Sequence, residues 1–110
     1  MQGNEEFPEA YRKVCKTNDI PDDEGHVVTV DDEQIAIFEV DGEYLAITNT
    51  CPHQGGPLAD GQVNGKTVHC PWHGYEFDLE SGEHVQAFSD DLSCMTYDLG
   101  VQDDEIYLLV

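Results

Sequence analysis

The sequence predicts an all-β fold of antiparallel strands arranged as a sandwich or barrel. Short segments rich in Val, Ile, Phe and Tyr recur along the 110 residues, and residues that favour turns separate them. Asp41-Gly42 is a strong signal for a hairpin, and Asn64-Gly65 indicates another tight turn. The regular spacing of the turns, without internal repeats or low-complexity tracts, is typical of layered β architectures.

The first half of the chain contains the clearest strand patterns. The segment 8–16 is ambiguous, because Pro8 suits the first turn of a helix whereas Tyr11 and Val14 also suit an edge strand. A polar loop follows over 18–25. Three antiparallel strands are then expected, over 26–30, 34–40 and 44–48. The stretch 35–38 is apolar on both faces, which predicts a strand at the centre of the core.

The second half predicts shorter strands around two loops. We expect 67–70 to be extended and to lead into Cys70, and 75–78 to form a strand whose aromatic side chains face inward. Residues 79–82 form a turn, and 84–88 return the chain toward its base. The segments 95–99 and 106–110 are expected to pair as a last hairpin around 102–105.

Two pairs of metal-ligating side chains lie between these strands. Cys51 and His53 are separated by one residue, and Cys70 and His73 by two. Each loop therefore offers one thiolate and one imidazole, so that two thiolates can bind one iron and two imidazoles a second, with bridging sulfides between them. A Cys2His2 zinc finger instead places a cysteine pair before a histidine pair.

The two loop sequences resemble those of the Rieske [2Fe-2S] ferredoxin family. The resemblance rests on Cys-Pro-His-Gln-Gly-Gly-Pro-Leu over 51–58 and Cys-Pro-Trp-His-Gly over 70–74. It implies a Rieske-like antiparallel β sandwich or barrel, with a base of about 8–49 and 89–110 and a small inserted cluster-binding subdomain of about 50–88. It also implies a [2Fe-2S] cluster held by four side chains. These are Cys51, His53, Cys70 and His73.

Departures from one branch of the family indicate the low-potential type. The cytochrome bc-type proteins carry an extra cysteine in each loop, and these cysteines form a disulfide. Gly56 and Trp72 occupy the corresponding places here. Tyr75 follows Gly74 where the bc type has a serine that donates to the cluster. The resemblance thus implies a potential toward the lower end of the Rieske range.

The resemblance implies a soluble one-electron carrier that takes electrons from a reductase and passes them to a terminal oxygenase or a related enzyme. We expect no enzymatic activity of the chain alone, because it contains neither a nucleophile elbow nor a glycine-rich phosphate loop. One alternative is the Rieske-like small subunit of a nitrite reductase. Another, of a different class, is a structural zinc-binding module that uses the same four ligands.

Carboxylates dominate the charge of the chain. Asp and Glu number 24 against 4 Lys and Arg, for a formal net charge of −20. Nucleic acids and anionic membranes are therefore excluded as partners, because both bind cationic surfaces. The acidity is interpreted either as a solvated surface suited to a saline cytoplasm or as a docking face for a basic partner. No apolar run approaches a membrane span and 1–6 has no signal-peptide pattern, so a cytoplasmic location is expected.

The ligand loops are nearly uncharged. Between Cys51 and Gly74 the charged side chains are Asp60 and Lys66. We therefore expect the contact face for redox partners to be an uncharged tip. Its expected members are Gln54, Pro57, Leu58 and Trp72.

The remaining cysteines and histidines have no spacing that predicts a site. Cys15 and Cys94 are interpreted as ordinary buried or half-buried thiols. His26, His69 and His84 lie in expected strands without a nearby thiol, and no role is assigned to them.

Overall fold

A computed structural model describes residues 11–21, 24–50, 56–71, 76–83, 85 and 94–109. The described residues form three antiparallel sheets and two short 3-10 helices, with no α-helix among them. The strands are β1 (Tyr11–Lys16), β2 (His26–Val30), β3 (Glu33–Val40), β4 (Glu43–Thr48), β5 (Gln62–Asn64), β6 (Thr67–His69), β7 (Glu76–Asp78), β8 (Thr96–Tyr97), β9 (Leu99–Gln102) and β10 (Glu105–Leu109); the 3-10 helices are η2 (Thr17–Asp19) and η3 (Leu58–Asp60). The all-β prediction is confirmed.

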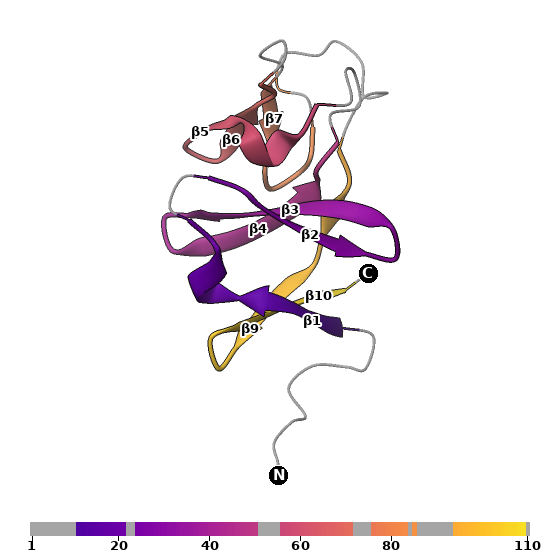
Figure 1. Ribbon diagram of the computed structural model, residues 1–110. Coiled ribbons are helices and arrows are strands. Elements are labelled where there is room, and N and C mark those ends of the chain that lie inside the picture. The colour runs from indigo at the N-terminus through magenta and orange to yellow at the C-terminus, as the bar shows by residue number, and fades with distance from the viewer. Residues whose placement is uncertain are drawn as a thin grey trace.

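The three sheets are stacked along the long direction of the molecule (Figure 1). The sheet β2-β3-β4-β8 lies in the middle, the sheet β1-β10-β9 lies below it, and the sheet β5-β6-β7 lies above it. Both outer sheets have three strands and the middle one has four. The middle sheet is therefore covered on both faces.

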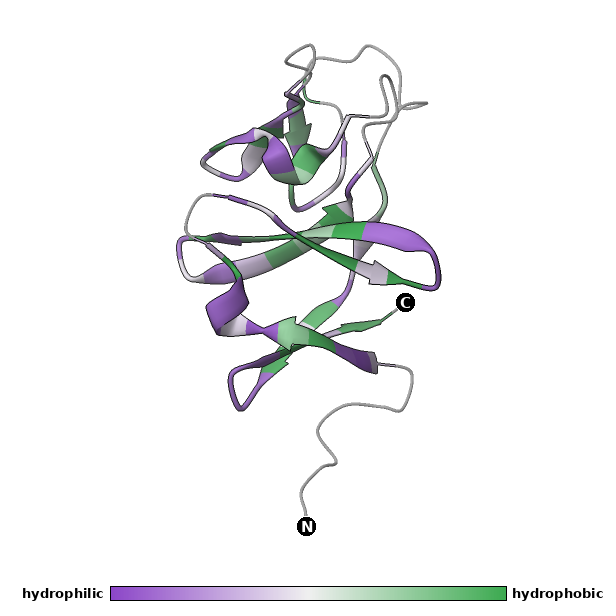
Figure 2. Ribbon diagram, viewed as in Figure 1, coloured by the Kyte–Doolittle hydropathy of each residue, from purple (hydrophilic) through white to green (hydrophobic). Residues whose placement is uncertain are grey.

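The central strand β3 explains why the core has two parts. Ile35, Ala36, Ile37 and Phe38 are all fully buried, as the apolar pattern on both faces predicts. Successive side chains of a strand point to opposite faces. Ala36 and Phe38 accordingly pack in the cluster beneath the upper sheet, whereas Ile35 and Ile37 pack in the cluster above the lower sheet. Green apolar segments run through the middle sheet in Figure 2.

Three hairpins share one turn geometry. Val30 pairs with Glu33 in the first of them, which leaves Asp31 and Asp32 as the two turn residues. Both have positive φ, of 52° and 70°. The turns Asp41-Gly42 and Asp103-Asp104 have positive φ at both residues too. This is the turn whose twist matches that of the flanking strands.

The expected final hairpin was partly wrong. Thr96 and Tyr97 pair with Ile47 and Ala46 of β4, so this short strand belongs to the middle sheet. The lower sheet instead pairs β9 with β10. The two-residue turn at 103–104 sets this register, since it places Gln102 opposite Glu105. The chain changes sheets at Asp98, between β8 and β9.

The strands in the first half of the chain agree with the sequence patterns. Residues 11–16 of the ambiguous segment 8–16 form the strand β1, which pairs with β10. The three expected antiparallel strands are β2, β3 and β4. The return segment 84–88 lies outside the described residues, except for residue 85.

Within the described part of the chain, no helix is long and apolar enough to cross a membrane.

Candidate metal centre

Cys70 is positioned by the hairpin of β5 and β6. Gln62, Val63 and Asn64 pair with the three residues of β6, and Gly65 in the turn has a φ of 62°, which glycine adopts without strain. Val68 is fully buried, and Cys70, two residues further along, is 2% exposed. The period of two in an extended chain explains why both side chains face the core.

The surroundings of Cys70 are apolar. It packs in one cluster with Leu58, Val68, Phe77 and Leu79. It is a free cysteine without a disulfide. A buried thiol in such a cluster is shielded from water, and Cys70 is the first residue of the second ligand loop.

Asn49 holds the two ends of the first ligand loop together. Its backbone carbonyl accepts the N–H of Leu58 at 2.6 Å, and its side-chain Oδ1 accepts the N–H of Ala59 at 2.8 Å. Thr50 and Pro57 form an isolated antiparallel bridge just inside these bonds. Asn49 is 3% exposed, and its Nδ2 donates to Oε1 of Gln34 at 3.2 Å. The residues that flank 51–55 are thus held close together by described contacts.

Two exposed ion pairs of Lys66 lie between the upper sheet and the middle one. The Lys66 ammonium lies 3.0 Å from Oε1 of Glu43 on β4 and 2.9 Å from Oε2 of Glu80. Hydrogen bonds to Glu80 and then Glu43 raise the pKa of Lys66 above its usual value. Lys66 therefore stays charged at neutral pH and bridges the turn before β6 to the middle sheet.

Several polar side chains lie around the end of β6, directly before Cys70. The Thr67 hydroxyl donates to Oε2 of Glu76 at 2.6 Å, and Nε2 of His69 lies 3.6 Å from the other carboxylate oxygen. The buried Nδ1 of His69 has no hydrogen-bond partner within the described part of the chain. Sequence patterns did not single out His69, because it stands in no Cys-x-His or Cys-x-x-His pair.

One of the four expected cluster ligands, Cys70, is among the described residues. Cys51, His53 and His73 lie outside them, as does Trp72. The structure therefore gives the position of the second loop's cysteine. The meeting of the two pairs stays a prediction.

The residues present fit a [2Fe-2S] cluster where the structure describes them. A thiolate ligand needs a cysteine without a disulfide, and Cys70 satisfies this requirement. Gly56 is buried at the far end of the first loop, in the place where a disulfide-forming cysteine would be found in the bc type. No clamp of that kind can form through this position.

The expected contact tip needs a correction. Leu58 has 0% exposure and packs against the apolar cluster that contains Cys70. It begins the 3-10 helix η3, whose turn directs the side chain inward. Pro57 is half-buried. Gln54 and Trp72 lie outside the described residues. Leu58 is therefore a core residue and belongs to no docking surface.

Comparisons with known proteins agree with this fold and motif. A family model described as Rieske [2Fe-2S] domain matches residues 10–95. The chain is 32% identical over 98 residues to the 3-phenylpropionate/cinnamic acid dioxygenase ferredoxin subunit of Photorhabdus laumondii, covering 88% of this chain and 91% of that protein. It is 36% identical over 91 residues to a human Rieske domain-containing protein, of whose length it spans 58%.

A solved structure shows the same architecture. The ferredoxin of Sphingomonas yanoikuyae B1 superposes with a TM-score of 0.80 at 28% identity, over 90% of this chain and 97% of that one. Both chains are thus alike over nearly their full lengths.

Proposed function

This chain belongs to the Rieske [2Fe-2S] domain family, and we propose that it is a one-electron carrier that passes electrons from a reductase to a terminal oxygenase or a related enzyme. The observation that carries the proposal is the match to a dioxygenase ferredoxin subunit over most of both chains. The family implies a [2Fe-2S] cluster, which accepts and releases one electron. The chain itself serves as an electron-transfer component and catalyses no reaction alone.

The cluster ligands in this proposal are Cys51, His53, Cys70 and His73. The burial of Cys70 supports it, because a thiolate held in an apolar cluster is protected from water and from exchange with other metals. Asn49 supports the opposite loop by fixing its two ends. These residues would hold the cluster ligands in place when the electron arrives or leaves.

The division into subdomains belongs to the same proposal. Residues of about 50–88 would form the cluster-binding subdomain and the rest a β base. The separate sheet β5-β6-β7 supports this division, because it pairs with no strand of the other two sheets. A cytoplasmic location stays a prediction from the sequence.

Metal content tests the proposal directly. We expect the purified protein to contain about two irons and two sulfides per chain, to absorb visible light, and to lose this absorption partly on reduction with dithionite. Cys70→Ser should lose the iron. Cys15→Ser is the matched control, because Cys15 is also a free cysteine but lies in the lower sheet.

The alternatives give different results. Bound zinc without iron in the purified protein would overturn the electron-carrier proposal in favour of the structural zinc module. Stable co-purification with a large reductase subunit would favour the nitrite reductase alternative. Reduction by a ferredoxin reductase, followed by oxidation with a ring-hydroxylating oxygenase, is the expected behaviour.

A further inference from the structure

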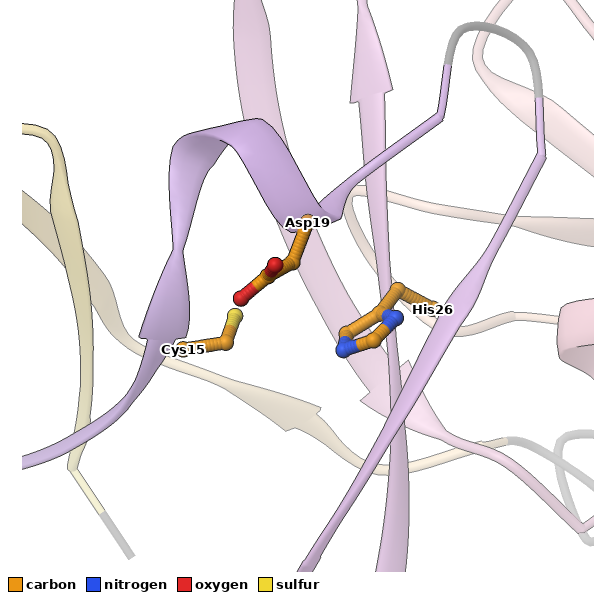
Figure 3. Close-up of side chains that lie close together, drawn as sticks. All are labelled: Cys15, Asp19 and His26. Atoms are coloured by element: carbon orange, nitrogen blue, oxygen red, sulfur yellow. The ribbon is translucent and has the colours of Figure 1, made fainter.

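Three side chains of types that bind metals lie close together between a strand of the lower sheet and a strand of the middle sheet. Cys15 belongs to β1, Asp19 ends the 3-10 helix η2, and His26 begins β2. The Cys15 sulfur, a carboxylate oxygen of Asp19 and a ring nitrogen of His26 all lie within 4.8 Å of one another. Figure 3 shows the thiol and the carboxylate directed at each other, with the imidazole beside them.

The local backbone holds this arrangement in place. Oδ2 of Asp19 accepts the backbone N–H of Lys16 at 3.0 Å, which fixes the carboxylate above the end of β1. The backbone N–H of Thr17 donates to the carbonyl of Asp104 at 2.9 Å and anchors η2 to the lower sheet. Ile20, the next residue after η2, is buried in the lower core. The turn is thus built by contacts that need no metal.

The cluster lies where two sheets have open edges. β1 is an outer strand of the sheet β1-β10-β9, and β2 is an outer strand of the sheet β2-β3-β4-β8. Neither strand pairs with the other, although they are neighbours. The ion pair of Arg12 with Asp31, at 3.3 Å, is another contact between these edges. A metal ion held by Cys15, Asp19 and His26 would join the two sheets at this seam.

We propose that Cys15, Asp19 and His26 form a site for a divalent transition-metal ion of the zinc class. One sulfur, one nitrogen and one oxygen donor suit zinc, whereas Ca²⁺ and Mg²⁺ prefer all-oxygen sites. Zinc bond lengths of about 2.0–2.3 Å place tetrahedral ligand atoms roughly 3.3–3.7 Å apart. The three ligand atoms lie within 4.8 Å of one another, so small side-chain rotations bring them to these distances. Water takes the fourth position.

Electrostatics favour a cation here. Burial and then the nearby negative charge of Asp19 raise the pKa of the Cys15 thiol to about 11. A cation between thiol and carboxylate is attracted by the charge of Asp19, and on binding it displaces the thiol proton, which passes to water. The ammonium of Lys13, two residues before Cys15, lies 3.3 Å from Glu105, so its positive charge is paired with a carboxylate. The net charge of −20 further concentrates cations around the protein.

The site is open to metal ions from solution. Cys15 and His26 are half-buried and Asp19 is exposed. Cys70 directly follows β6 of the upper sheet, whereas Cys15 lies in β1 of the lower sheet. Metal binding at the seam should therefore change stability without removing the iron.

The test uses the intact, iron-loaded protein and zinc itself. Zinc is titrated against a chromophoric chelator, with millimolar Mg²⁺ present to occupy non-specific acidic sites. We expect one tight site per chain, a melting temperature that rises with zinc, and unchanged visible absorption. Cys15→Ser and His26→Gln should each weaken zinc binding at least tenfold and remove the rise in melting temperature.

Two controls separate this site from the acidic surface. Asp98→Asn removes an exposed carboxylate on the link between β8 and β9 and should leave zinc affinity unchanged, whereas Asp19→Asn should weaken it. Asparagine at 19 keeps an oxygen that accepts the Lys16 N–H. Equal zinc affinity in wild type, Cys15→Ser and His26→Gln would overturn the proposal.

A chemical readout does not depend on any variant. Saturating zinc should slow the alkylation of Cys15 by iodoacetamide at least tenfold, as measured by mass spectrometry of the peptide that contains it. Alkylation of Cys15 at the same rate with and without zinc would overturn the proposal, even if the substituted proteins failed to fold.

Discussion

The side-chain oxygen of Asn49 accepts a hydrogen bond from the backbone N–H of Ala59 at 2.8 Å, across the base of the first ligand loop. Among the described residues, Asn49 is the polar residue that is buried, with 3% of its surface exposed. Its carbonyl also accepts the N–H of Leu58. A single residue thus fixes the start of η3 relative to the end of β4.

Asn49→Ala should destabilise the protein and impair iron retention. The substitution leaves the buried N–H of Ala59 without an acceptor, which costs about 1–3 kcal/mol. For a domain of this size we expect the melting temperature to fall by roughly 5–15 °C. Thermal melts and iron analysis of the same preparation measure both effects. Asn18→Ala, at an exposed position in η2, is the control and should change neither.

Gly61→Ala should lower the stability of the protein more than a substitution between two small residues usually does. Gly61 has a φ of −78°, so alanine meets no backbone strain, but the added Cβ would overlap the carbonyl oxygen of His69. The resulting shift costs about 3 kcal/mol and moves the residue directly before Cys70. Urea unfolding followed by circular dichroism measures the loss, and the visible spectrum reports the cluster.

Gly42→Ala provides the comparison for Gly61. Its φ is 80° and nothing lies within 4 Å of an added Cβ, so only backbone strain of about 1 kcal/mol is expected. A loss at Gly42 equal to or larger than that at Gly61 would contradict the steric argument.

Leu58→Ala should lower stability by about 3 kcal/mol through a cavity beside Cys70. Leu58 is fully buried in the cluster that contains the thiol. Leu109→Ala is the matched control, because Leu109 is 36% exposed on β10 and its truncation should cost far less. Similar losses in the two variants would show that Leu58 is not a core residue in solution.

Sequence patterns predicted the strands that form one local unit. The strands β2, β3 and β4 follow from alternating apolar residues and from turn signals, and the burial of both faces of β3 follows from its unbroken apolar run. These features depend on neighbours in the chain. The sheet change at Asp98 depends on which distant strand offers a free edge, so pattern alone missed it.

The same distinction applies to the sites. Short spacing made the Cys-x-His and Cys-x-x-His pairs visible in the sequence, and Cys70 lies at the expected strand end. Leu58 was misjudged, because an uncharged loop residue gives no sign of the direction of its side chain. Cys15, Asp19 and His26 follow no ligand motif, and only the meeting of two sheet edges brings them together.

Asp32→Gly should stabilise the hairpin of β2 and β3. Asp32 has a φ of 70°, a conformation that costs an L-residue about 1 kcal/mol and glycine nothing. The greater freedom of glycine in the unfolded chain offsets part of this, so the net gain is about 0.5 kcal/mol. Asp32→Asn removes the charge but keeps the side chain. Equal melting temperatures of the two variants would assign the gain to charge and not to conformation.

Added NaCl should raise the melting temperature between about 10 mM and 1 M, where the screening length falls from about 30 to about 3 Å. Salt weakens attraction and repulsion alike. The attractive ion pairs of Arg12, Lys13 and Lys66 are exposed and contribute little. The 24 carboxylates outnumber the 4 basic side chains, so relief of repulsion dominates.

Asp103→Asn, which removes one charge from a turn, should shift the low-salt melting temperature upward and flatten the salt dependence. A melting temperature that falls with salt would mean that the ion pairs outweigh the repulsion among the acids.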